Sequence, residues 1–123
     1  MQTFTIEGRF WSLNQLIAAS KTHWSQYSEQ EKGYRHMVWA AARSANLHAI
    51  SKPCIVRMWF YEKDLRRDID GVMAAAAKPI LDGLQDANVL PEDNREWVIG
   101  IEGRFPPPDK DNPRVVIEIL EEE

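Results

Sequence analysis

The feature that most limits the fold is an alternation of strand-type and helix-type hydrophobic spacing along the chain. In residues 2–10, Phe4 and Ile6 alternate with polar residues, which is the period of a strand with one buried face. The run Cys54–Tyr61 is rich in β-branched and aromatic residues and predicts a second strand. Between these strands, residues 29–48 place apolar side chains at helical spacing. The first half of the chain therefore predicts a strand, a helix and a strand.

The start of that helix is marked by a local signal. Ser28 is followed three residues later by Glu31, which is the pattern of a capping box. Residues 11–27 before it carry polar and aromatic side chains with no sustained period, so we expect a long loop there.

The second half of the chain predicts a helix and two more strands. Asp70 is expected to cap a helix that starts at Gly71, and Pro79 is expected to kink that helix or reset its start. The loop that follows is expected to span Asn88–Arg95. The last two strands are expected at Trp97–Glu102 and Arg114–Leu120, joined by a hairpin loop over Pro106–Pro113.

The predicted order is β-α-β-α-β-β, and the predicted class is α+β. A small mixed sheet with two helices over one face would bury the apolar sides of all these segments. The sequence shows no repeat, low-complexity tract or linker, so residues 1–123 are expected to form one domain.

Composition and charge exclude several classes. Hydrophobic residues make up 44% of the chain and charged residues 28%, a globular balance that excludes a disordered chain. The formal net charge is −4, so any nucleic-acid site has to be a local basic patch on an acidic protein. No apolar run approaches the length of a membrane span, and no signal peptide is expected near Met1. A cytoplasmic location is therefore expected, with no membrane partner.

The cysteine and the tryptophans have ordinary explanations in most places. Cys54 lies in a strand pattern and is expected to be a buried thiol. Trp39 and Trp59 lie in helix and strand patterns, so packing in the core or in a dimer contact is expected for both. Trp11 and Trp24 lie in the long loop and are candidates for stacking on unpaired bases.

The densest chemistry is the run Arg66-Arg67-Asp68-Ile69-Asp70. Asp68 and Asp70 would point the same way on an extended backbone, and paired carboxylate oxygens suit a hard divalent cation. Arg66 and Arg67 could hold a phosphate beside that ion. In most proteins such an acid pair is simply a solvated loop.

Further charged residues strengthen the motif. Lys78 and Asp82 are four residues apart and are expected to form an ion pair on one helix face. Asp93 follows in the next loop. Three carboxylates could hold a metal with open positions for water and a phosphate, which is the arrangement for hydrolysis of a phosphodiester.

These residues resemble the signature of RusA-type Holliday junction resolvases. The resemblance is carried by Arg67-Asp-Ile-Asp70, by Lys78-Pro-Ile-Leu-Asp-Gly-Leu84 and by Glu92-Asp93. Weaker similarity continues over most of the chain, at Ser12-Leu-Asn14 and Tyr34-Arg35.

The resemblance implies a function and a set of roles. Asp68, Asp70 and Asp93 would be metal-binding catalytic carboxylates, and Lys78 would contact the scissile phosphate or the attacking water. The ion would be Mg²⁺, with Mn²⁺ as the alternative. Family members are homodimers that nick two opposed strands of a four-way DNA junction, and a two-fold dimer suits that task. The residues expected to contact DNA are Arg66, Arg67, Lys21 and Lys63.

The sequence departs from the family pattern in three respects. Gly71 stands where an Asn is usual, and Lys78 lies about one helical turn, or about 6 Å of rise, farther from Asp70. If the additional residues extend the helix, Lys78 moves away from the acids. If they form a loop near Pro79, it returns to them. The acidic net charge is the third departure, because phosphate neutralisation drives DNA affinity.

Two alternatives stay open. One is a nuclease of the same fold that acts on other branched DNA. The other is a non-catalytic nucleic-acid or protein interaction module, in which the acids are solvated decoration. Convergence of Asp68, Asp70 and Asp93 would favour the enzyme, whereas an Asp93 that points away would favour the interaction module.

Overall fold

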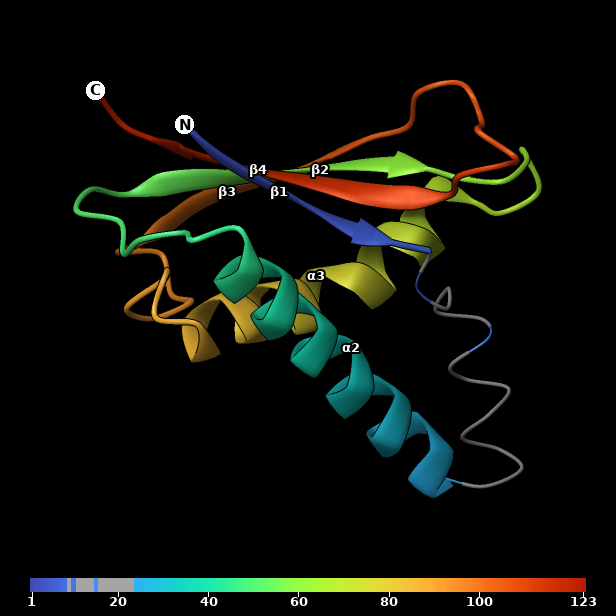
Figure 1. Ribbon diagram of the computed structural model, residues 1–123, viewed down its shortest axis with the longest axis horizontal. Helices are drawn as coiled ribbons and strands as arrows, with labels where there is room; N and C mark the ends of the chain where they lie inside the picture. The colour runs from blue at the N-terminus through green and yellow to red at the C-terminus, as the bar shows by residue number, and fades with distance from the viewer. Residues whose placement is uncertain (9, 11–14, 16–23) are drawn as a thin grey trace.

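The computed structural model describes residues 1–8, 10, 15 and 24–123, with the backbone alone for 24–27. It contains two helices and a four-stranded sheet in the expected order β-α-β-α-β-β, which confirms the α+β class (Figure 1). The elements are β1 (Gln2–Glu7), α2 (Trp24–Ser44), β2 (Cys54–Tyr61), α3 (Ile69–Asp86), β3 (Val98–Arg104) and β4 (Arg114–Glu121).

The sheet is mixed, with the strand order β1-β4-β2-β3. β4 is antiparallel to both of its neighbours, β1 and β2, whereas β2 and β3 are parallel. β1, β2 and β3 therefore run in one direction, and the last strand lies between the first and the second. The first and last strands of the chain pair with each other along most of their length.

The expected hairpin over Pro106–Pro113 is wrong, because β3 and β4 are not neighbours. A tight hairpin usually joins its strands with two to five residues, and this connection is longer and contains four prolines, which cannot donate ladder hydrogen bonds. The segment instead carries the chain from the sheet edge past β2 to the place between β1 and β2.

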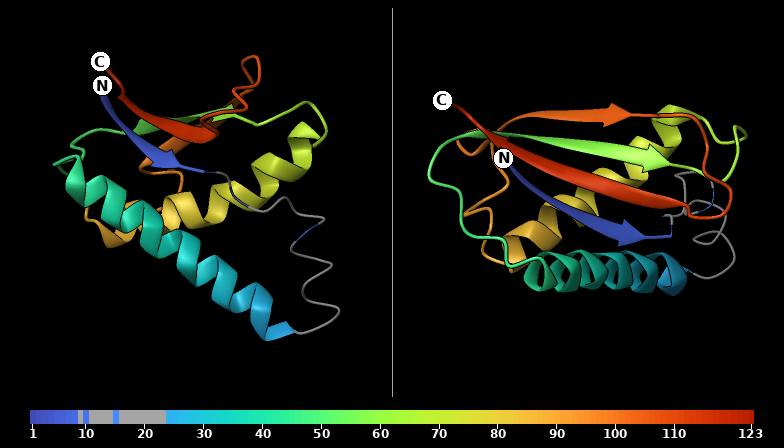
Figure 2. Two further views of the ribbon diagram at one scale, coloured as in Figure 1. Left: turned by 45° about the vertical axis from the view of Figure 1, so that its right-hand side comes forward. Right: turned by 45° about the horizontal axis from the view of Figure 1, so that its top comes forward.

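Both helices cover one face of the sheet, as expected, and the core lies between the two layers (Figures 1 and 2). Cys54 is buried in β2, as predicted, and burial raises the pKa of its thiol to about 11, which keeps it protonated at neutral pH. The inward-facing residues of the sheet include Phe4, Ile6, Val56, Met58, Phe60, Val115, Ile117 and Ile119.

The first helix is displaced from its expected range. α2 begins at Trp24, so Ser28 and Glu31 lie inside the helix and do not mark its start. Trp24 consequently belongs to a helix and not to the loop. The helix ends at Ser44, before the expected residue 48, because Asn46 adopts a left-handed backbone with a φ of 55°.

The second helix begins earlier than expected and is not interrupted. Asp68, not Asp70, is its N-cap residue, and the helix continues through Pro79 to Asp86. Pro79 is buried with Ile80 and Leu84 against the core. Packing of this apolar face offsets the missing backbone hydrogen bond, so the proline does not reset the start.

The helices approach each other closely at Gly83 of α3. A Cβ atom there would lie 2.5 Å from Cβ of Val38 and 2.8 Å from the carbonyl oxygen of Arg35. Only glycine therefore fits at this position without a shift of the helices.

We expect Gly83→Ala to destabilise the fold by about 2 kcal/mol, because the added methyl group overpacks the helix contact. Urea unfolding followed by circular dichroism measures this. The matched control is Gly33→Ala in α2, where nothing lies within 4 Å of the added atom. That change should stabilise the protein by about 0.5–1 kcal/mol through helix propensity. Equal effects at both positions would contradict the close contact.

Candidate functional site

The start of α3 presents two exposed carboxylates. Asp68 has an extended backbone as N-cap residue, and its side chain makes no capping hydrogen bond. Asp70 lies in the first turn, and its Oδ1 atom accepts a hydrogen bond from the backbone N–H of Gly71 at 2.9 Å. An extended backbone from Asp68 to Asp70, which would point both side chains the same way, is therefore not present, because residues two apart do not face each other on a helix. Mg²⁺ usually keeps several waters and takes only one or two protein carboxylates, so either exposed carboxylate remains a possible ligand.

Arg67 is largely buried beside the acids. Its guanidinium forms a bidentate ion pair with Glu62, with hydrogen bonds of 2.7 and 2.8 Å. Nη1 of Arg67 also donates to the carbonyl oxygen of Phe10 at 2.5 Å and to Oε1 of Gln15 at 3.1 Å. The side chains of Arg67 and Glu62 are each 11% exposed. Arg67 therefore anchors the loop that leads into α3, and its contact with DNA stays a prediction.

Arg66 and Lys63 have the opposite environment. The Arg66 side chain is 89% exposed, and its Nε atom lies 3.9 Å from a carboxylate oxygen of Asp64. Lys63 is exposed and forms no ion pair with any residue that the structure describes. Both cations therefore face solvent near the two acids, as a phosphate contact requires. Lys21, the fourth predicted DNA contact, lies outside the described residues.

Asp93 lies at the other end of the molecule from Asp68 and Asp70. β2 and β3 are parallel, and Val98 at the start of β3 pairs with Cys54 at the start of β2. The loop after β2 and the loop before β3 must therefore lie at opposite ends of the sheet (Figures 1 and 2). α3 alone has 18 residues and spans about 27 Å.

One chain thus does not gather the three carboxylates. Within residues 1–8, 10, 15 and 24–123, no group of three or more His, Cys, Asp or Glu side chains could hold a metal ion. Asp68 and Asp70 are two residues apart in the chain, and Asp93 lies far from both.

Lys78 pairs with Asp82 and Glu31 and lies away from Asp68 and Asp70. Because α3 is continuous, Lys78 lies about 12 Å beyond Asp70 along the helix axis. Its Nζ atom is 3.1 Å from Asp82, which confirms the expected ion pair, and 3.8 Å from Glu31. The hydrogen bond to Asp82 is the main cause that raises the pKa of Lys78, and the carboxylates of Glu31 and Asp93 raise it further.

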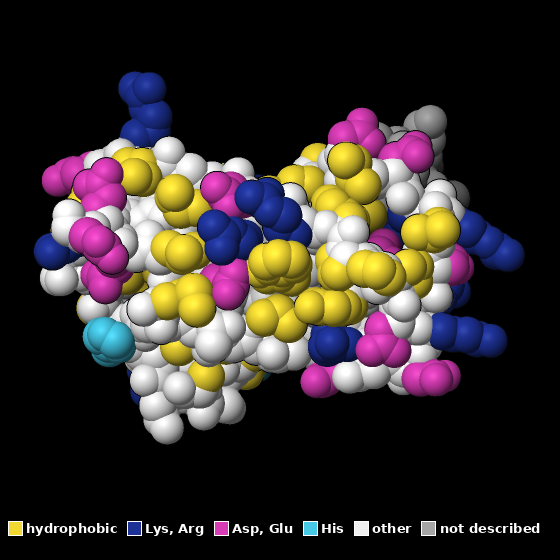
Figure 3. Space-filling view, turned by 90° about the horizontal axis from the view of Figure 1, so that it is seen from above, with side chains coloured by type: hydrophobic (Ala, Val, Ile, Leu, Met, Phe, Trp, Pro, Cys, Tyr) yellow, Lys and Arg dark blue, Asp and Glu magenta, His cyan; other side chains and the backbone are white. Residues whose placement is uncertain are grey.

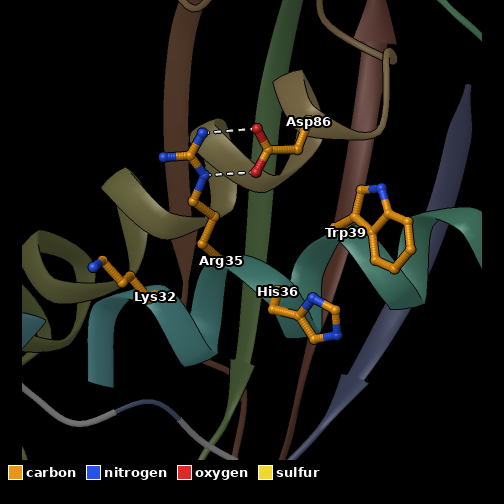
Figure 4. Close-up of a pocket in the computed structure, with 5 residues that line it drawn as sticks. All are labelled: Lys32, Arg35, His36, Trp39 and Asp86. Atoms are coloured by element: carbon orange, nitrogen blue, oxygen red, sulfur yellow. Dashed lines mark hydrogen bonds and ion pairs between the residues drawn. The ribbon is translucent and has the colours of Figure 1, made fainter. Parts of the chain in front are cut away.

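A hollow of about 400 Å³ lies between α2 and α3 (Figure 4). None of Asp68, Asp70 and Asp93 lines it. Arg35 forms a bidentate ion pair with Asp86 there, at 2.5 and 2.7 Å. The rings of His36 and Trp39 stack at 5.3 Å, and Trp39 is 37% exposed, so this tryptophan is not a core residue. The ion pair ties the two helices together at the surface.

The Arg35–Asp86 pair predicts a pH-dependent contribution to stability. The hydrogen bond from Arg35 lowers the pKa of Asp86, so the stabilisation is present above the ordinary Asp pKa and is lost as the pH falls through the lowered value. We expect Asp86→Asn to cost about 0.5 kcal/mol at neutral pH, as for exposed pairs. Urea unfolding at neutral and strongly acidic pH measures this. A cost that persisted in strong acid would contradict an electrostatic origin.

The face of the sheet away from the helices carries paired charges among apolar side chains (Figure 3). Arg57 lies 2.8 Å from Glu102 and 3.5 Å from Glu118. Glu118 also accepts a hydrogen bond from the indole N–H of Trp59, so Trp59 lies on this open face and not in the core. Because these charges neutralise one another, the open face does not supply the basic patch that DNA binding needs.

No model of a known protein family and no curated protein matches this chain. The resemblance to RusA-type resolvases therefore depends on the motif residues themselves. Neither helix in the described part of the chain is long and apolar enough to cross a membrane.

Proposed function

We propose that this protein is a RusA-like, Mg²⁺-dependent endonuclease that resolves four-way DNA junctions by paired nicks, in recombination and repair. The observation that carries the proposal is the exposed pair Asp68 and Asp70 at the start of α3, beside the exposed cations Lys63 and Arg66. Metal-dependent phosphodiester hydrolysis uses carboxylates to hold the metal, and DNA binding uses cations to contact phosphates; here both lie in one short segment.

Each group in this segment has a task. Asp68 and Asp70 would hold Mg²⁺, which when bound activates a water and neutralises charge on the phosphate. Arg66 and Lys63 would bind phosphates on either side of the scissile one. The ion pair of Arg67 with Glu62 fixes the loop so that these groups keep their positions.

The distant Asp93 gives the proposed homodimer a specific role. Because α3 separates Asp93 from Asp68 and Asp70 in one chain, Asp93 would join the acid pair of a second copy. Lys78 would accompany it, since its charge interacts with Asp93. A two-fold dimer would then hold two equivalent shared sites, which suits the two opposed strands of a junction.

The second candidate is a non-catalytic interaction module. It is favoured by the position of Asp93 at the far end of the chain's sheet and by the net charge of −4. In that case the exposed acids would be solvated and would hold no metal.

The test is nicking of a synthetic four-way junction beside a three-way junction, a flap and a linear duplex of equal length. Each is incubated with Mg²⁺ or with EDTA. Paired nicks on the four-way junction that need Mg²⁺ are the expected result. Nicks confined to the other branches would favour the alternative nuclease. Junction binding without nicks would favour the interaction module.

A further inference from the structure

Two exposed apolar side chains accompany the proposed metal-binding acids: Leu65 precedes them in the chain and Ile69 lies between them. Leu65 is 86% exposed and Ile69 is 61% exposed, and Leu65 is the most exposed large hydrophobic side chain in the described part of the chain. Burial of a leucine stabilises a fold by about 1.5–3 kcal/mol, and Leu65 contributes almost none of this. Folding therefore does not account for the leucine at this position.

A small hollow lies beside these side chains. It has a volume of about 130 Å³. Its apolar lining includes Leu65, Ile69, Phe105, Pro106 and Pro108, and its charged lining is Glu62, Asp64 and Arg67. The Phe105 ring stacks on Phe60, with centroids 5.0 Å apart and planes 19° apart. A cavity of roughly 150 Å³ holds one six-membered ring, so the hollow has room for the edge of one flat ring and not for a whole nucleotide.

Two solvent-facing cations near the hollow favour a nucleic acid over an apolar peptide. Arg66, next to Leu65 in the chain, extends into solvent, and Lys63 is exposed on the same loop. Arg67 and Glu62, which line the hollow, neutralise each other, and Asp64, also in the lining, lies 3.9 Å from Nε of Arg66. An apolar tip between solvent-facing cations matches a base whose neighbouring phosphates need positive partners.

We propose that Leu65, supported by Ile69, is a wedge that contacts an unstacked base at the branch point of a DNA junction, with the base edge in the hollow. Apolar side chains of this kind insert at base steps and cost a few kcal/mol of unstacking in a regular duplex. At a branch point stacking is already interrupted, so the same contact costs less. The wedge would therefore favour branched over linear DNA, and it rests on the proposed function.

Branch-point contact is tested with a four-way junction that carries 2-aminopurine at its centre, in EDTA so that no strand is cut. The wild type should brighten the 2-aminopurine and bind the junction in preference to duplex. Leu65→Ser should lower that preference about tenfold and remove the brightening. Leu65→Met should keep both. The control is Ile99→Ser, which alters another exposed apolar side chain, 48% exposed, at the start of β3.

Nicking of the same junction in Mg²⁺ separates the two proposals. Wild-type nicking with an unchanged preference in Leu65→Ser overturns the wedge alone. Leu65-dependent brightening without any nicking supports the wedge and overturns the endonuclease. Absence of junction binding by the wild type overturns both. Because Leu65 is exposed, its variants should unfold at the wild-type urea midpoint, and a lowered midpoint would show a structural role in place of the wedge.

Discussion

Asp70→Asn is expected to lower Mg²⁺-dependent nicking of a four-way junction about a thousandfold, since a metal contributes several kcal/mol to the transition state. The amide keeps the shape of the side chain and its oxygen can still accept the hydrogen bond from Gly71. It removes the negative charge that would hold the proposed ion. The measurement is the single-turnover nicking rate in Mg²⁺, with junction affinity measured separately in EDTA.

The matched control is Asp111→Asn, the same chemical change at an exposed acid in the connection before β4. It should leave the nicking rate and the affinity unchanged. Wild-type nicking by Asp70→Asn would show that the acid pair holds no catalytic metal. A loss of affinity in EDTA together with a loss of nicking would show that Asp70 acts in DNA binding.

The shared site makes a sharper prediction for a mixture of two inactive variants. In the proposed dimer, Asp70→Asn and Asp93→Asn would each break both sites. In a dimer that contains one copy of each, one site combines the intact Asp68 and Asp70 of one chain with the intact Asp93 of the other. An equal mixture should therefore recover about a quarter of wild-type single-strand nicking, given random exchange of subunits.

Two outcomes of the mixing experiment would decide against the shared site. If all three acids acted within one chain, each site of the mixed dimer would lack one acid and no activity would return. Full nicking by Asp93→Asn alone would show that Asp68 and Asp70 suffice. Paired nicks should not return in the mixture, because a mixed dimer has only one intact site.

Local patterns in the sequence were enough to predict the elements. Phe4 and Ile6 alternate with threonines and are buried in β1, and the range Cys54–Tyr61 matches β2 at both ends. Strand neighbours could not be predicted in the same way. The pairing of β4 with β1 and β2 is decided by tertiary contacts, and the connection over Pro106–Pro113 resembles a turn whichever strand follows it.

In the candidate site, too, local features could be predicted from the sequence and long-range positions could not. Exposure of Asp68 and Asp70 follows from their place next to a helix start, which the sequence indicates. The position of Asp93 does not follow from its spacing. It depends on β3 lying parallel to β2, because a helix between parallel strands sends its two loops to opposite ends of the sheet.

Arg67→Ala is expected to destabilise the protein by about 3 kcal/mol, because it leaves the charge of Glu62 buried without a partner. The carbonyl oxygen of Phe10 also loses its donor. Arg66→Ala, one residue away, should change stability by less than about 0.5 kcal/mol, and should weaken junction binding in a salt-dependent manner. Urea unfolding measures the stabilities, and a salt titration of junction affinity measures the DNA contact.

The double variant Arg67→Ala with Glu62→Ala separates the ion pair from other effects of Arg67. Removing both charges leaves no unpaired charge in the loop, so the double variant should be more stable than Arg67→Ala alone by about 1–2 kcal/mol. If the loss of stability in the double variant instead equals the sum of the losses in the two single variants, the two side chains act independently. Arg67→Ala could instead keep full stability and lose junction affinity. That result would show that Arg67 contacts phosphate, so that Arg66 and Arg67 would both bind DNA as the sequence predicts.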